Sequence, residues 1–189
     1  MGDLEYVFQG LPLHVLLVHV VVIAVPAVAV LLVVLAAWPG ARRVLWIPAL
    51  IAAVLLVPLG LVTVAAGEWL QARVPAAPLI EAHTGQGEDI VPWLYAVLGV
   101  AVLVSAWQVV TVVRGRRARR RLDASADGSM TVPDAAAGVN RTVRVVVAIV
   151  LTVVAIIVAV GAIWTVVRIG ESGSRAVWEG SYSDTPLER

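Results

Sequence analysis

The 189-residue chain contains no cysteine and no lysine, has a single phenylalanine, and is only 14% charged. The absence of cysteine excludes disulfides, thiolate metal sites and cysteine nucleophiles. Soluble domains are about one-quarter charged, so this low fraction, together with 60% hydrophobic residues, is typical of a membrane protein. The chain also has no P-loop, glycine-rich dinucleotide motif or Ser-His-Asp pattern. We therefore expect a membrane protein that is not an enzyme.

Four uncharged segments are long enough to cross a membrane. A hydrocarbon core of about 30 Å needs about 20 apolar residues in a helix. The segments have 28, 23, 23 and 23 residues and are Leu11–Trp38, Val44–Ala66, Val91–Val113 and Val145–Val167. The predicted fold class is all-α, a four-transmembrane-helix bundle in a lipid bilayer.

Polar segments flank and connect these spans. Residues 1–10 are an acidic extension whose LEYVFQG stretch is similar to an engineered protease site, so a vector-derived and a native origin both stay open. A tight turn is expected at residues 39–43 and an extracytoplasmic loop with an amphipathic segment at residues 67–90. Residues 114–144 are predicted to form a basic linker with a flexible centre, and residues 168–189 a polar tail.

Arginine is unevenly distributed among the polar segments. Ten of the 14 arginines lie in residues 39–43 and 114–144, whereas ten of the 13 acidic residues lie in the other polar segments. By the positive-inside rule, the two arginine-rich segments are cytoplasmic and both termini are extracytoplasmic. The absence of lysine and the excess of alanine and valine suggest a GC-rich bacterial genome, so we expect a multi-pass protein of the bacterial inner membrane.

The densest basic run is RGRRARRR, residues 114–121. Its side chains could bind anionic lipid headgroups, or they could fix the topology without having a partner of their own. Nucleic acid is not an expected partner, because nothing else in the chain resembles a groove-reading element. The candidate lipid-binding residues are Arg114, Arg116, Arg117, Arg119, Arg120 and Arg121.

The three histidines all fall in the half of the protein that is predicted to be extracytoplasmic. His14 and His19 lie about 4.5 and 12 Å along the first span and about 140° apart around it, so a straight helix does not let both bind one ion. Because an ionisable side chain in a span is costly, His19 is expected to face away from lipid. Three glycines lie near its depth and either leave a cavity for a cofactor or water, or allow close helix packing with His19 bonded to a backbone carbonyl or Thr63. These are Gly60, Gly99 and Gly161.

His83 belongs to a segment with helical periodicity. Residues 80, 83, 87, 90 and 94 recur at spacings of three and four, so the third helix is expected to begin before the membrane and to turn His83 toward the bundle. Glu68 is expected in the same layer. Imidazole with carboxylate suits Zn²⁺, Fe or Cu²⁺, so the candidate metal ligands are His14, His83 and Glu68.

Three motifs stand in order along the chain, LPLHVLLVH, AAGEWLQARVP and EAHTGQGEDIVPW. In their order and spacing they resemble a bacterial family of four-helix membrane proteins known as domain of unknown function 2231. The resemblance covers most of residues 7–180 and singles out His14, His19, Glu68, His83 and Gly87. Two positions depart from the family pattern, because Val15 replaces a proline and Glu171 stands where a histidine is expected.

The resemblance implies a haem-b-type bundle in a respiratory or redox setting, with His14, His19 and His83 as cofactor ligands. A histidine lost at position 171 would leave one coordination position unfilled. We expect Glu171 either to lie within hydrogen-bond reach of His14, His83 or Arg73, or to be a solvated tail residue. The leading functional hypothesis is an accessory subunit of a larger respiratory membrane complex. The alternatives are a membrane electron-transfer protein that binds haem b or a transition metal, and a small transporter.

Overall fold

The computed structural model describes residues 6–126 and 140–183. In chain order, the described elements are β1 (Val7–Phe8), β2 (Leu11–Pro12), α1 (Leu13–Ala37), α2 (Pro39–Gln71), α3 (Pro78–Gly87), the 3-10 turn η1 (Glu88–Ile90), α4 (Val91–Ala126) and α5 (Arg141–Trp178). Within this part of the chain, four helical segments are long and apolar enough to cross a membrane. One of these segments is continuous through α3, η1 and α4. The predicted all-α four-helix architecture is confirmed.

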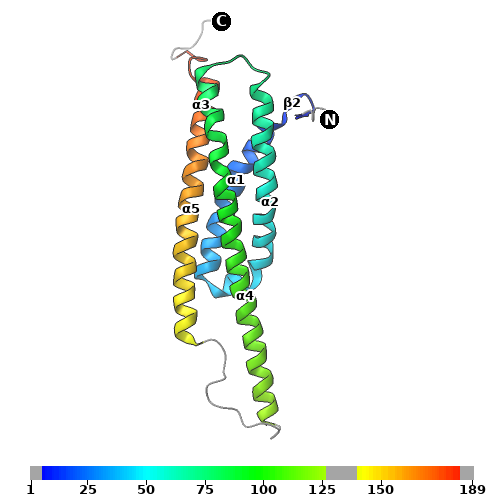
Figure 1. Cartoon of the computed structure of the whole chain (residues 1–189), viewed down its shortest axis with the longest axis vertical. Coiled ribbons are helices and arrows are strands. Elements are labelled where there is room, and N and C mark those ends of the chain that lie inside the picture. Colours follow the sequence, from blue (N-terminus) through cyan, green and yellow to red (C-terminus); the bar gives the residue numbers. More distant parts are fainter. Residues whose placement is uncertain (1–5, 127–139, 184–189) are drawn as a thin grey trace.

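The long helices form an up-and-down bundle (Figure 1). α1 packs against α2 and α5, and α4 closes the ring by packing against α2 and α5 on the other side. The start of α1, the end of α2, α3 and the end of α5 lie together at one end of the bundle, which we call the histidine end. The opposite end, where α2 and α5 begin and α4 emerges, is called the arginine end.

Large side chains from one helix pack against small residues of the next. A Cβ added to Gly60 of α2 would overlap Leu94 of α4, and one added to Gly161 of α5 would overlap the Trp93 ring. Leu94 is among the most deeply buried side chains of the bundle. These two glycines therefore allow close helix packing and do not line a cofactor cavity, whereas a Cβ at Gly99 would meet no atom within 4 Å.

The helices are longer than the predicted spans. The turn expected at residues 39–43 is wrong, because α2 begins at Pro39 and only Trp38 separates it from α1. Proline is well suited to the first position of a helix, where its missing N–H leaves no hydrogen bond unmade. At the histidine end, α5 continues to Trp178, so the first half of the predicted tail is helical.

The predicted basic linker is also partly helical. α4 runs through the arginine-rich run to Ala126, and α5 begins at Arg141 with the Asn140 side chain accepting a hydrogen bond from the Thr142 N–H. Arginine and alanine are strong helix formers, which explains why the helix does not stop at Val113, where the predicted span ends. The centre of the predicted linker lies outside the described residues.

A buried arginine closes the arginine end. Arg42 is 4% exposed, and its Nε donates to Oε1 of Gln108 on α4 at 3.2 Å. Its Nη1 donates to the carbonyl oxygens of Leu35 and Ala36 at 3.1 and 3.2 Å. These are among the last carbonyls of α1, which have no partner within their own helix. Arg42 therefore fixes the turn between α1 and α2, in addition to contributing positive charge at this end.

Candidate functional site

His14 of α1 and His83 of α3 meet at the histidine end. Their ring centroids are 6.3 Å apart, with an angle of 70° between the ring planes. α3 begins at Pro78, before the apolar segment of α4, and turns His83 toward α5. The prediction that His83 faces the bundle is confirmed. We call the two imidazoles the paired histidines.

His14 is held by the backbone of α2. Its Nδ1 lies 2.9 Å from the carbonyl oxygen of Thr63, and because a carbonyl can only accept, Nδ1 must carry the hydrogen. The ring lies close to Gly67, where an added Cβ would be only 2.9 Å from Nδ1. In the neutral ring, Nε2 therefore keeps its lone pair.

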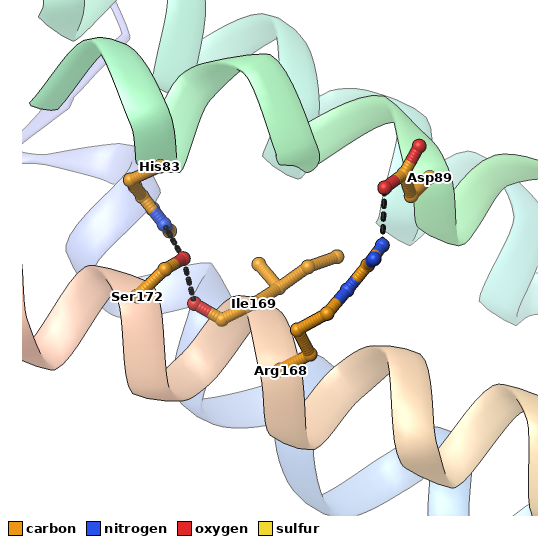
Figure 2. Close-up of polar contacts among 5 residues, drawn as sticks. All are labelled: His83, Asp89, Arg168, Ile169 and Ser172. Atoms are coloured by element: carbon orange, nitrogen blue, oxygen red, sulfur yellow. Dashed lines mark hydrogen bonds and ion pairs between the residues drawn. The ribbon is translucent and has the colours of Figure 1, made fainter. Parts of the chain in front are cut away.

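His83 is held in the same way by α5. Its Nδ1 lies 3.0 Å from Oγ of Ser172, and the Ser172 hydroxyl donates to the carbonyl of Ile169 at 2.9 Å (Figure 2). Because the single hydroxyl hydrogen is used in this way, Ser172 accepts a hydrogen bond from His83. An added Cβ at Gly173 would lie 2.8 Å from Cε1 of His83. The neutral His83 ring therefore also has a free lone pair on Nε2.

The surroundings of His83 favour its neutral form. His83 lies outside the apolar segment 91–113 that is predicted to cross the membrane. Burial lowers the pKa of His83 and the neighbouring His14 lowers it further, while the backbone carbonyl of Ile169 acts in the opposite direction. A neutral imidazole can donate its Nε2 lone pair to a metal ion, whereas an imidazolium cannot.

An ion pair lies next to the paired histidines on the side toward the membrane. Arg168 of α5 binds the carboxylate of Asp89 in η1 (Figure 2), and both side chains are about half exposed. Asp89 lies six residues after His83, about 9 Å along the helix. Half-exposed charges do not fit the hydrocarbon core, so the paired histidines lie on the polar side of the membrane boundary.

His19 does not join the paired histidines. It is exposed, and its Nδ1 donates to the carbonyl of Val15 at 2.7 Å, within α1. The prediction that His19 faces away from lipid is therefore wrong, although the alternative of a backbone carbonyl partner is confirmed. His19 lies five residues beyond His14, about 7.5 Å along α1 and close to the level of Asp89, where an exposed imidazole is tolerated.

Glu68 is close to this layer but does not complete a metal cluster. Among residues 6–126 and 140–183, no three histidine, aspartate or glutamate side chains are grouped closely enough to hold a metal ion. Glu68 instead lines two surface cavities, of about 310 Å³ with Gln71 and Glu81 and of about 510 Å³ with Glu88. A Cβ added at Gly87 would meet no atom within 4 Å, so no neighbouring helix packs closely against this glycine.

Glu171 binds a different partner from the ones predicted. Its Oε1 is 2.7 Å from Nη2 of Arg175, one turn further along α5, and both side chains are exposed. Arg73 lies over the Trp69 ring and donates to the Trp69 carbonyl. The expected contact of Glu171 with a histidine or Arg73 is therefore wrong. Successive helical residues point about 100° apart, and it is the next residue, Ser172, that faces His83.

Comparisons with family models, with curated proteins and with solved structures found no match. The resemblance to domain of unknown function 2231 therefore stays a prediction that rests on the sequence motifs alone.

Proposed function

We propose that this multi-pass membrane protein binds a transition-metal ion through Nε2 of His14 and of His83, on the extracytoplasmic face of a bacterial membrane. The observation that supports the proposal is that each ring donates its Nδ1–H to a fixed acceptor, a carbonyl or a hydroxyl. Histidines that bind metal almost always use their second nitrogen in this way, which fixes the tautomer and the ring orientation.

The donor set limits the class of ion. Imidazole suits Zn²⁺, copper, iron and Ni²⁺, whereas Mg²⁺ and Ca²⁺ prefer oxygen. The chain has no cysteine that would favour a thiolate site. When bound, copper or iron would supply one-electron chemistry and Zn²⁺ would not. The residues of the chain hold the ion, and two imidazoles leave further coordination positions for water or for a group from a partner.

A haem fits these residues less well than a single ion. A haem needs a pocket of several hundred Å³ between its ligands. The two cavities described above are lined by neither His14 nor His83, and both rings lie against helix backbone at Gly67 and Gly173. Haem b is therefore an alternative outcome of the binding experiment and not part of the proposal.

Metal titration of the purified protein tests the site. We expect one Cu²⁺ or Zn²⁺ per chain, and a loss of at least about tenfold in affinity for His14→Gln and for His83→Gln. His19→Gln is the matched control, because His19 is exposed and bonded only within its own helix. Equal losses in all three variants, or no binding by the wild type, would contradict the proposal. A Soret band after expression with added haem would favour haem b instead.

We further propose that the protein serves as a non-enzymatic accessory subunit of a larger redox complex. The unfilled coordination positions and the absence of catalytic motifs support this role, because a partner could supply the remaining ligands. Purification in a mild detergent is expected to recover stoichiometric membrane partners. A monodisperse protein that is recovered without partners would argue against the accessory role and leave the metal site unaffected.

A further inference from the structure

The arginine end carries a feature that the metal site does not explain. α4 continues for more than three turns beyond Val113, the end of its continuous apolar segment, and projects past the other helices (Figure 1). In residues 114–121 the arginines are exposed. A single rod of this length with so many positive charges is a surface for an anionic partner.

The direction of the arginines around the helix axis indicates which partner this is. At about 100° per residue, the exposed apolar residues of the preceding turns point between about 160° and 340° from the direction of Arg114. These residues are Val102, Leu103, Val109, Val110, Val112 and Val113. This sector is the lipid-facing side of α4.

Three arginines continue the lipid-facing side. Arg116, Arg120 and Arg117 point at about 200°, 240° and 300° on the same scale, within the sector of the exposed apolar residues. The buried residues Val97, Val100, Ala101, Val104 and Gln108 point between about 40° and 140°, and this bundle-facing side is continued by Ala118 and Gly115. Arg119, at about 140°, and Arg114, at 0°, lie at the borders between the two sides. The residues that face hydrocarbon in one turn are therefore followed by guanidinium groups in the next.

We infer that residues 114–120 of α4 form an arginine collar that binds the phosphate groups of anionic phospholipids in the leaflet at the arginine end. Arginine pairs with phosphate through two parallel hydrogen bonds. The headgroup layer is about 5 to 7 Å thick on each side of the bilayer, and residues 114–120 extend over about 9 Å. The first arginine directly follows the apolar segment that ends at Val113, which places the collar at the depth of the phosphates.

Other anionic partners fit these observations less well. A nucleic acid or an acidic protein would contact one side of a rod that projects into the cytoplasm. It would not require the arginines to continue the lipid-facing sector or to begin directly after Val113. Arg43, Arg141 and Arg144 are also exposed at the same end, where α2 and α5 begin, so three of the four long helices carry exposed arginines at this end.

Lipid retention in reconstituted protein tests the collar. The full chain is placed in nanodiscs that contain a minority of phosphatidylglycerol in phosphatidylcholine, and the lipids that stay bound are measured by native mass spectrometry. We expect phosphatidylglycerol to be enriched, and the enrichment to fall at least about twofold in Arg117→Gln/Arg120→Gln. Added salt is expected to reduce the enrichment, because it screens exposed charges.

The matched control removes the same charge from the histidine end. Arg73→Gln/Arg175→Gln changes two exposed arginines that lie far from the collar, and it is expected to keep the enrichment of the wild type. Arg117→Lys/Arg120→Lys preserves the charge and shows whether the helix itself tolerates substitution. Equal enrichment in the Gln variant and the wild type would overturn the inference, as would an equal loss in the control. Tighter binding of duplex DNA than of phosphatidylglycerol would overturn it as well.

Discussion

Gly67 of α2 and Gly173 of α5 allow the paired histidines to approach the backbones of their neighbouring helices. An alanine Cβ would lie 2.9 Å from Nδ1 of His14 at the first position and 2.8 Å from Cε1 of His83 at the second. Real Cβ atoms do not approach so closely, so each ring would have to move away from its acceptor. We predict that Gly67→Ala and Gly173→Ala each lower metal affinity by about tenfold or more, as changes in outer-shell partners do.

Gly170→Ala is the control for this prediction. It also replaces a glycine near the end of α5, but its Cβ would meet no atom within 4 Å. Metal titration and thermal unfolding of the three variants separate a local effect from a loss of fold. Unchanged affinity in both Gly67→Ala and Gly173→Ala would show that the rings are not positioned by these contacts.

The lowered pKa of His83 predicts a dependence of stability on pH in the absence of metal. As the pH falls below about 6.5, the unfolded chain takes up a proton on His83 before the folded chain does. The contribution of neutral His83 to the free energy of unfolding is therefore fully present above this pH. It decreases as the pH falls toward the lower pKa of His83 in the folded state. Detergent-based unfolding over a pH series should show this decrease in the wild type and not in His83→Gln. Identical pH profiles would contradict it.

Part of the site could be predicted from residue spacing. The periodicity around His83 indicates which face of its helix turns toward the bundle, and the order of the spans places His14 at the same end. The role of Ser172 could not be predicted, because serine in a polar helix end carries no signal of its own and its partner is 89 residues away. The sequence places His19 wrongly, because the first predicted span begins at Leu11, further out than the membrane boundary that the Asp89–Arg168 pair indicates.

At the scale of the elements, α4 and α5 contact each other through Trp93 and Gly161. An alanine at position 161 would overlap the Trp93 ring, so either the ring or the helix must shift. We predict that Gly161→Ala destabilises the bundle by about 1 to 3 kcal/mol, as overpacking does. Gly99→Ala is expected to be neutral or slightly stabilising, because it meets no atom and alanine favours helix more than glycine does. Unfolding in mixed micelles measures both variants, and equal stability would contradict the packing argument.

The existence and order of the four helices could be predicted from hydropathy, whereas their ends could not. Hydropathy reports the part of a helix that lies in lipid, and it says nothing of turns that continue into water. α4 and α5 both extend well beyond their apolar segments. Arg42 gives a further example, because its sequence position indicates only a charge near the membrane, while its bond to Gln108 depends on how α2 and α4 pack.

At the scale of the whole molecule, the chain crosses the bundle four times, so the histidine end and the arginine end lie on opposite sides of the membrane. The excess of arginine at one end predicts that this end is cytoplasmic. The chain has no cysteine, so a single introduced cysteine reports the side on which it lies. Gly85 of α3 and Gly115 of α4 form a matched pair, because both are exposed and neither has an atom within 4 Å of an added Cβ.

We predict that a membrane-impermeant maleimide labels Gly85→Cys on intact spheroplasts and labels Gly115→Cys only after the membrane is permeabilised. The reason is that arginine-rich segments stay on the cytoplasmic side during insertion, which leaves α3 and the paired histidines outside. The reverse pattern would place the metal site in the cytoplasm and the arginine collar in the outer leaflet. Labelling of both variants on intact spheroplasts would indicate two orientations, which the strong arginine asymmetry argues against.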